Sequence, residues 1–206
     1  MARQPVPSSQ QQHIMILIEE PLTVQTYLQL FADGCPEKFR PRICPHCLTQ
    51  VLLHRHGKYN RHAYTPDGQS RLPIYRFICP NPNCRKTTAL LPSFLKEHHQ
   101  ISLDLQEKVI RQQAEGKTLV QLSEELEVPG GPFSEKTIWR WIRTWNKDLV
   151  NYVSVVWKFI LEFIPHLQLP VGTNKPRQEW GWLFYAWDQL KAKFPRIAVG
   201  SMLSWL

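Results

Sequence analysis

CPHC at residues 44–47 and CPNPNC at residues 79–84 are the stretches that decide the fold of this 206-residue chain. The first is a C-x2-C pair and the second a C-x4-C pair, with turn-forming Pro or Asn between the cysteines. Zn²⁺ prefers four thiolate or imidazole ligands in a tetrahedron, and two short loops can each supply two of them. We therefore predict one structural Zn²⁺ per chain, held by Cys44, Cys47, Cys79 and Cys84.

Other fates of these cysteines stay open, because a single C-x-x-C can be a redox pair and clustered thiols can form disulfides. His46 is an alternative ligand, although an exposed position within its turn suits it better. Cys35 lies outside the pattern, and we expect a free thiol. The polar N-terminal sequence MARQPVPSSQQQ is not typical of a signal peptide, and no apolar run approaches the roughly 18–20 residues of a membrane span. We expect a cytoplasmic, nucleoid-associated protein that does not contact a membrane.

The charge around the cysteines is one-sided. Between Phe39 and Lys96 there are ten Lys or Arg residues and one acid, which gives this window +9, whereas the whole chain carries +8. A compact basic block is typical of a phosphate-binding surface, although a solvated face is the simpler alternative. We expect a zinc ribbon over 42–96, with two strands around Gly57 within 48–65 and a third over 72–79. Its expected DNA contacts are Arg55, Lys58 and Arg61.

Residues 101–149 have helical periodicity and divide into three helices. We expect them at about 102–115, from the N-cap Thr118, and from the N-cap Ser134. On the third helix, one face carries an apolar stripe of Ile138, Trp141, Ile142 and Trp145. The opposite face, which could enter the major groove of DNA, carries Lys136, Thr137, Arg140, Arg143, Thr144 and Lys147. The alternative is an ordinary three-helix bundle whose last helix is basic.

The order of these motifs resembles the zinc-ribbon and helix-turn-helix modules of bacterial insertion-sequence transposases and transposon-associated proteins. The similarity covers roughly residues 42–149 and is strongest in RFICPNPNCRKTTALLPSFL (76–95) and SEKTIWRWIRTW (134–145). It implies recognition of specific double-stranded DNA, often transposon ends, by the cysteine module (residues 42–96) and the outward face of the third helix. One departure is the stretch 129–133, which makes the turn before that helix longer than three to four residues.

Catalytic constellations are weak. The acids near and beyond the end of the third helix lie on or between apolar helices, without the strand framework that a two-metal carboxylate site needs: Asp148, Glu162, Glu179 and Asp188. His54 and His56 could hold a metal beside Tyr152, but such pairs usually flank an apolar residue rather than Arg55. We expect no enzymatic activity. The alternatives are a catalytic DNA-processing protein (a metal-dependent nuclease or shortened transposase) and a zinc-ribbon adaptor that binds protein.

The sequence thus predicts an α+β fold in four parts. A partly disordered N-terminal segment (1–41) contains a strand within 13–20 and a helix closed by Gly34, and the ribbon and three helices follow. The last part, 150–206, is helical, and a loop near 170–178 separates its two apolar helical stretches. Its final helix carries an apolar stripe of Trp180, Leu183, Phe184, Trp187, Leu190 and Phe194. This stripe either packs on neighbouring helices or forms an interface for self-association or a transposition partner.

Overall fold

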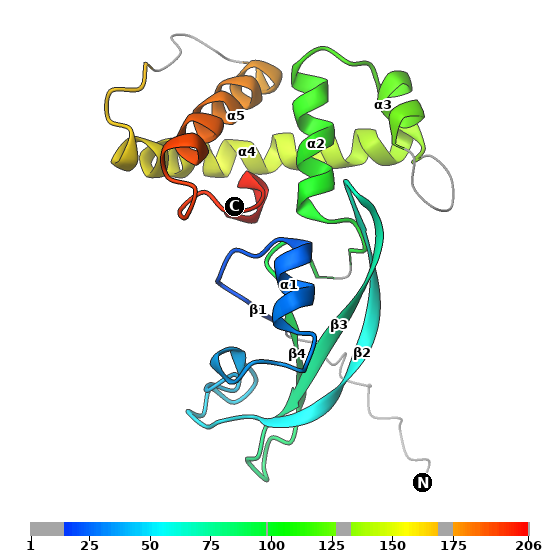
Figure 1. Cartoon of the computed structure of the whole chain (residues 1–206), viewed down its shortest axis with the longest axis vertical. Helices are drawn as coiled ribbons and strands as arrows, with labels where there is room; N and C mark the ends of the chain where they lie inside the picture. Colours follow the sequence, from blue (N-terminus) through cyan, green and yellow to red (C-terminus); the bar gives the residue numbers. More distant parts are fainter. Residues whose placement is uncertain (1–14, 98, 127–132, 169–174, 206) are drawn as a thin grey trace, which may run out of the picture.

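Two lobes stacked end to end make up the chain (Figure 1). The computed structural model describes residues 15–97, 99–126, 133–168 and 175–205. One lobe, the sheet lobe, holds a four-stranded sheet and helix α1, and the other, the helical lobe, holds α2 to α5. The expected mixed α and β class is confirmed. Within the described ranges, no helix has both the length and the apolar character needed to cross a membrane.

The sheet combines distant parts of the chain in the order β1-β4-β3-β2. β1 (Met15–Leu17) runs parallel to β4 (Thr87–Leu91). β3 (Gly68–Ile78) is antiparallel to both β4 and β2 (His54–Thr65). The segment before residue 42, which we delimited as a separate part, therefore contributes a strand to the same sheet as the cysteine module. Residues 1–12, where we expected disorder, lie outside the described residues.

β2 and β3 form a long hairpin, and here the prediction of two strands around Gly57 is wrong. β2 is a single strand whose pairing register with β3 shifts between Arg55 and Lys58. Gly57 has a φ of 93°, which a glycine adopts readily, and it forms a β-bulge rather than a turn. The chain reverses instead at residues 66–67, a Pro-Asp pair followed by Gly68 with a φ of 112°.

Helix α1 (Val24–Leu30) packs on the sheet and supplies aromatic rings to its core (Figure 1). Thr23 caps the helix, because its side chain accepts a hydrogen bond from the Thr26 amide. Tyr27 and Phe31 are buried, and their ring centroids lie 4.3 Å apart. The Tyr27 hydroxyl donates to the Pro73 carbonyl of β3, so the helix is tied to the hairpin. The N-terminal segment is therefore part of the core that supports the cysteines.

Three helices follow with the expected starts. α2 (Leu103–Ala114) is followed by α3 (Leu119–Glu125), where Thr118 and Gln121 form a capping box. Ser134 caps α4, as predicted, by accepting from the Thr137 amide at 3.3 Å. Together the three helices enclose a small apolar core of Leu105, Val109, Leu122, Leu126, Ile138 and Ile142. The stretch 127–132, which contains most of the unusually long turn, lies outside the described residues.

α4 (Glu135–Phe163) is one continuous helix of 29 residues, about 43 Å long. It passes through the boundary that we placed between 149 and 150, so the third helix and the first C-terminal helix are the same element. No Gly or Pro interrupts residues 135–163, and the helix stops at Ile164, directly before Pro165. The two halves of α4 therefore belong to one rigid rod that joins both parts of the helical lobe.

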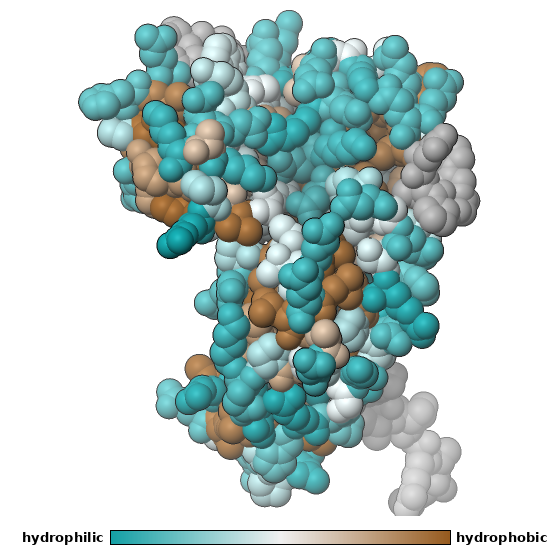
Figure 2. All heavy atoms as spheres, viewed as in Figure 1, coloured by the Kyte–Doolittle hydropathy of each residue, from teal (hydrophilic) through white to brown (hydrophobic). Residues whose placement is uncertain are grey.

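The C-terminal part packs on that rod. α5 (Pro176–Lys193) begins with Pro at its first position, and a short 3-10 helix, η2 (Met202–Trp205), closes the chain. Most of the Trp-rich stripe is buried against α4, α2 and η2, which favours the core interpretation over an interface. The face drawn in Figure 2 is mainly hydrophilic, with apolar patches beside α1 and at the end of the helical lobe that holds the α4 C-terminus.

Aromatic contacts fix the hairpin against the helical lobe. Tyr64, near the end of β2, packs edge-on against Phe133, with their ring centroids 5.9 Å apart. Phe133 in turn packs against Trp141 of α4, with ring centroids 5.0 Å apart. The Ser102 amide, just before α2, donates to the Tyr64 carbonyl. The Lys96 ammonium lies 3.6 Å from the centroid of the Trp145 ring. The orientation of the first half of α4 relative to the sheet lobe is therefore set by direct packing.

Candidate metal centre and nucleic-acid interface

Two turns of matching local geometry present the four cysteines. In each turn, the amide of the first cysteine donates to the carbonyl two residues beyond the second, at 3.1 Å for Cys44 and 3.0 Å for Cys79. The residue directly after the second cysteine has a positive φ, 58° for Leu48 and 49° for Arg85. Non-glycine residues rarely adopt this conformation, and they keep it only where the surrounding structure imposes it. Both turns are thus held in the same shape despite their different lengths.

The four sulfur atoms converge to within 4.8 Å of one another. Cys44 Sγ lies 3.8 Å from Cys84 Sγ, and Cys47 Sγ lies 3.7 Å from Cys79 Sγ. A metal–sulfur bond of about 2.3 Å places the corners of a regular tetrahedron about 3.8 Å apart. These separations are far longer than a disulfide bond of about 2.05 Å. The four cysteines that the spacing singled out are therefore together, with a geometry that can hold a metal ion.

The surroundings of the sulfurs differ. Cys44 and Cys79 are buried, whereas Cys47 and Cys84 are half-buried. Burial raises the pKa of the Cys79 thiol to about 12, and hydrogen bonding with Thr49 lowers the pKa of Cys47 to about 6. Metal ligation requires thiolates, so a bound cation would stabilise the charged form that burial disfavours.

Two neighbouring residues do not join this cluster. The His46 ring lies on the Thr87 carbonyl, with Nε2 3.2 Å from the oxygen, so the structure uses it to connect the first turn to β4. Cys35 is buried in the sheet-lobe core and forms no disulfide. Burial also raises the pKa of its thiol, to about 11. Cys35 is therefore a free core thiol, as the sequence predicts.

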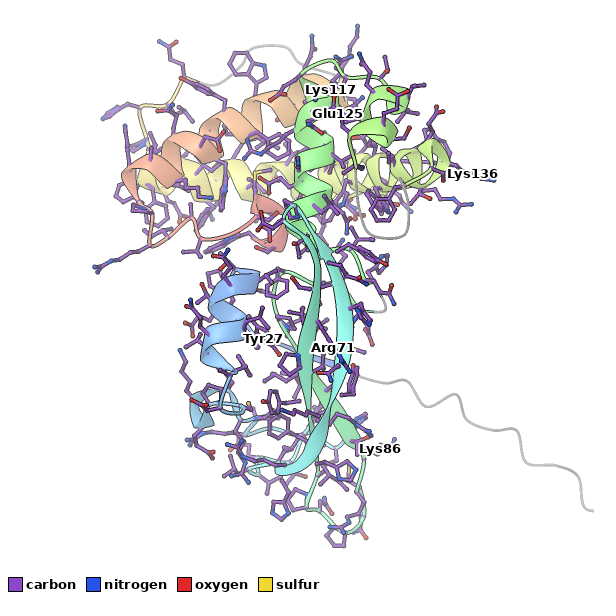
Figure 3. The ribbon with its side chains drawn as sticks, turned by 45° about the vertical axis from the view of Figure 1, so that its right-hand side comes forward. Tyr27, Arg71, Lys86, Lys117, Glu125 and Lys136 are labelled. Atoms are coloured by element: carbon purple, nitrogen blue, oxygen red, sulfur yellow. The ribbon has the colours of Figure 1, made fainter. Side chains whose placement is uncertain are left out.

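The first half of α4 separates an apolar face from a basic one. Ile138, Ile142 and Trp145 are buried, and Trp141 is half-buried. On the other side, Thr137 is half-buried, and five residues are exposed: Lys136, Arg140, Arg143, Thr144 and Lys147. Figure 3 shows Lys136 pointing away from the body of the helical lobe. The six residues selected from the sequence therefore do share the side of the helix that lies opposite the core.

Two residues of this face have partners that limit their freedom. The Arg143 guanidinium lies 5.1 Å from the centroid of the Trp139 ring, so the exposed tryptophan orients it. The Thr137 hydroxyl lies 3.0 Å from that of the cap residue Ser134. Among the described residues, no ion pair engages Arg140 or Lys136. These two side chains are the freest cations at the start of α4.

The three sheet-lobe cations chosen from the sequence have different environments. Arg55 and Lys58 are exposed, and Arg55 forms an ion pair with Glu37 at 2.9 Å. Arg61 is half-buried, and its guanidinium donates to the carbonyls of Lys96 and His99. Arg61 therefore braces β2 against the connection to α2, whereas the other two remain at the surface.

The carboxylates considered for catalysis are dispersed. Asp188 receives a bidentate ion pair from Arg111 at 2.9 and 3.0 Å, and Glu179 accepts from the Trp157 indole at 2.7 Å. Asp148 lies 3.9 Å from the Lys96 ammonium. His54 and His56 lie on β2 of the sheet lobe, whereas Tyr152 lies on α4 of the helical lobe. The structure does not bring these acids together, nor the histidines to the tyrosine.

Several contacts around these sites were not found from the sequence. The sequence shows Lys96 only as one of the cations of the basic window. In the structure it contacts Trp145 and Asp148 at the junction of the lobes. The bulge at Gly57 places Arg55 and Lys58 on the face of the hairpin that carries Tyr75. The sequence signal for this bulge is an isolated glycine within an otherwise strand-like run.

Residues 44–141 match the model of a protein family described as a domain of unknown function (DUF6431). The match covers just under half of the chain, from the first cysteine of the cluster to Trp141 of α4. It therefore spans the cluster, the hairpin, α2, α3 and the first turns of α4 as one unit. No curated protein and no solved structure matches the chain.

Proposed function

We propose that this chain is a non-enzymatic, sequence-specific DNA-binding protein, in which a zinc ribbon supports a helix-turn-helix. The observation that carries the proposal is that the first half of α4 has an apolar face on one side and a basic face on the other. Its first half buries Ile138 and Ile142 against α2 and α3 while exposing Arg140, Arg143 and Lys147 on the other side. Arg can pair bidentately with guanine, and a Thr methyl can contact thymine, so this face suits the major groove.

The length of α4 limits which residues read bases. The helix spans about 43 Å, which exceeds the width of the major groove, about 12 Å, several times. Its second half packs against α5 through Val156 and Ile160. The base-reading segment is therefore the first turns, from Lys136 to Lys147, and the second half acts as a support that holds them in position.

In this proposal the sheet lobe supplies affinity. Its window of net charge +9 contacts phosphates, which carry no sequence information, and Arg55 and Lys58 are the exposed members nearest the bulge. The metal is Zn²⁺, and four protein thiolates leave it no open coordination position, so its role is to fold the two cysteine turns. The matched sulfur separations support this choice of metal.

The biological setting that we propose is transposition or transcription regulation, with double-stranded DNA as the partner in the bacterial cytoplasm. The support is the resemblance of residues 42–149 to transposase DNA-binding modules. The family match over 44–141 covers most of the same stretch and names no function. Because the Trp-rich stripe of α5 is buried in the helical lobe, we place any contact with a transposition partner or second copy on other surfaces.

Selection of bound sequences from a random duplex library tests the proposal. A recovered consensus, together with affinity that falls steeply with salt, supports sequence-specific binding. Weak, salt-insensitive binding without a consensus would instead favour the protein-interaction adaptor. The parallel assay for the catalytic alternative is incubation of the protein with supercoiled and single-stranded DNA in Mg²⁺ or Mn²⁺. Cleavage activity that stays with the protein through purification would establish the catalytic alternative.

A further inference from the structure

The bulge in β2 turns two cations to the same side of the hairpin. In an unbroken strand, side chains three positions apart point to opposite faces. Here Arg55 pairs with Phe77, and Lys58 pairs with Tyr75, two residues earlier on β3. Since Tyr75 and Phe77 share a face, the extra residue in β2 places Arg55 and Lys58 on that face too.

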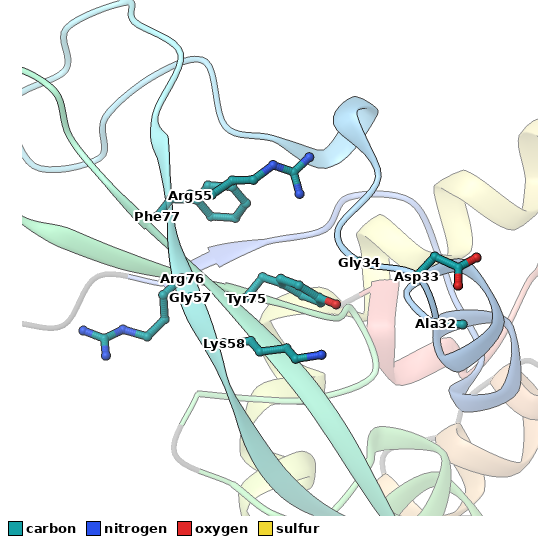
Figure 4. Close-up of a pocket in the computed structure, with 9 residues that line it drawn as sticks. All are labelled: Ala32, Asp33, Gly34, Arg55, Gly57, Lys58, Tyr75, Arg76 and Phe77. Atoms are coloured by element: carbon teal, nitrogen blue, oxygen red, sulfur yellow. The ribbon is translucent and has the colours of Figure 1, made fainter.

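Figure 4 shows the result. Arg55, Lys58 and Tyr75 extend from the hairpin toward the turn after α1. Arg76 lies between Tyr75 and Phe77 on β3, and its side chain extends the opposite way. Between the hairpin and that turn lies an open cavity of about 350 Å³. This volume falls at the lower end of the roughly 300–1,000 Å³ of small-molecule sites.

The chemistry of the cavity is that of an anion site with an apolar wall. The Lys58 ammonium lies 5.8 Å from the Tyr75 ring centroid, and Phe77 lies beside Tyr75 in the lining. The Tyr75 hydroxyl donates to the Phe31 carbonyl at 3.3 Å, which fixes the ring. The lining includes one acid, Asp33, and its carboxylate is directed away from the hairpin side chains (Figure 4).

We propose that this cavity binds a single nucleotide, with Arg55 and Lys58 holding its phosphate and Tyr75 lying against its sugar or base. Two cations match the charge of one phosphate ester, and the aromatic wall favours a nucleotide over inorganic phosphate. Arg55 is paired with Glu37, which is not among the residues that line the cavity, and an exposed ion pair of this kind exchanges its partner at little cost. The proposal goes beyond duplex binding, because a nucleotide inside a cavity is unpaired: it belongs either to a free mononucleotide or to a single strand.

The test is isothermal titration of the full zinc-loaded chain with thymidine 5′-monophosphate, thymidine, inorganic phosphate and a single-stranded thymidine pentanucleotide. We expect the monophosphate or the pentanucleotide to bind, and thymidine and inorganic phosphate to bind at least about tenfold more weakly. Tighter binding of the monophosphate assigns a free nucleotide as the source, and tighter binding of the pentanucleotide assigns a single strand. Binding of neither would overturn the proposal.

Matched variants separate the cavity from general charge. Lys58→Ala should weaken nucleotide binding by about tenfold or more, and Lys58→Arg should restore most of it. Arg71→Ala removes the same charge from an exposed position of β3 outside the cavity and should change the affinity less than twofold. Equal losses in Lys58→Ala and Arg71→Ala would contradict a built site. A blunt hairpin duplex, titrated in parallel, reports duplex binding separately, so failure of the nucleotide arm leaves the proposed function standing or falling on its own measurement.

Discussion

Cys44 Sγ lies 3.8 Å from the sulfur of Cys84, a residue of the other cysteine turn. This cross-pairing, with Cys47 and Cys79 as its counterpart, means that one ion would crosslink two turns that are about 35 residues apart in sequence. The buried member of each turn, Cys44 or Cys79, contacts the core directly. Loss of the ion would therefore release both the hairpin base and the loop before it.

We predict about one Zn²⁺ per purified chain by elemental analysis, and its removal by a chelator should unfold the sheet lobe. Cys79→Ser should behave like the chelated protein in circular dichroism and thermal melts, because it removes a buried ligand. Cys35→Ser is the matched control, since that thiol lies outside the cluster, and its zinc content should be unchanged. A Cys79→Ser chain that remains folded with less than about half an equivalent of zinc would contradict a structural metal.

Arg61 should act on stability rather than on DNA. Its guanidinium donates to two backbone carbonyls between the lobes, and hydrogen bonds from a charged donor contribute about 1.5–3 kcal/mol. Arg61→Ala should therefore lower the free energy of unfolding by about 1–3 kcal/mol in urea titrations. Arg55→Ala, which removes an exposed cation, should cost less than about 1 kcal/mol. Equal stabilities of the two variants would show that the contacts of Arg61 do not join the lobes.

Trp187 should behave as a core residue. It is fully buried in the cluster formed by α2, α4, α5 and η2, and we expect Trp187→Ala to cost about 3–5 kcal/mol of stability. Its indole nitrogen has no acceptor among the described residues. Because Trp187→Phe removes this unsatisfied buried donor, the variant should lose much less stability than its smaller side-chain volume alone would suggest. Sedimentation velocity should show the same oligomeric state for all three proteins. A change of oligomeric state without loss of stability would restore the interface interpretation.

Asp104 predicts a pH dependence. Burial, followed by the charge of Glu107, raises the pKa of this carboxyl to about 6 from its usual 3.8. The folded state then binds a proton more readily than the unfolded state between about pH 4 and 6, so stability falls as the pH rises through that window. Asp104→Asn should therefore be stabilised relative to wild type at pH 7.5, and the difference should shrink toward pH 4.5. Thermal melts at both pH values check this, with the exposed Glu162→Gln as control. A stability difference independent of pH would contradict it.

Local chemistry was predictable from the sequence. Thr118 and Ser134 cap helices because their side chains satisfy amides only three residues away, and the four cysteines were recognisable from spacing alone. The stripe containing Trp187 follows helical periodicity, so its shared face could be inferred, although its burial could not. In each case the sequence signal lies within a short stretch of the chain, even where the contact itself, as between Cys44 and Cys84, joins distant residues.

Long-range features were not predictable in the same way. The parallel pairing of Met15 with Ala89 depends on two segments more than 70 residues apart, and nothing local encodes it. An isolated glycine such as Gly57 is compatible with a turn or a bulge, and the neighbouring strand decides between them. α4 continues through residue 150 to the next helix breaker, Pro165, whereas we placed a boundary between 149 and 150.

The central claim is that the first half of α4 reads sequence while the sheet lobe supplies non-specific affinity, and the titration of variants on selected and scrambled duplexes at several salt concentrations tests it most directly. Arg140→Ala should cost about 1–3 kcal/mol on the selected site and flatten the preference at one base pair. The double variant of Arg55 and Lys58 to Ala should weaken both duplexes alike and lower the salt slope by about 0.9 for each phosphate that these two cations neutralise. Arg196→Ala, an exposed cation of the C-terminal part, is the charge-matched control and should change neither. If Arg140→Ala weakened both duplexes equally while the double variant lost discrimination, the reading function would belong to the sheet lobe and the account would be contradicted.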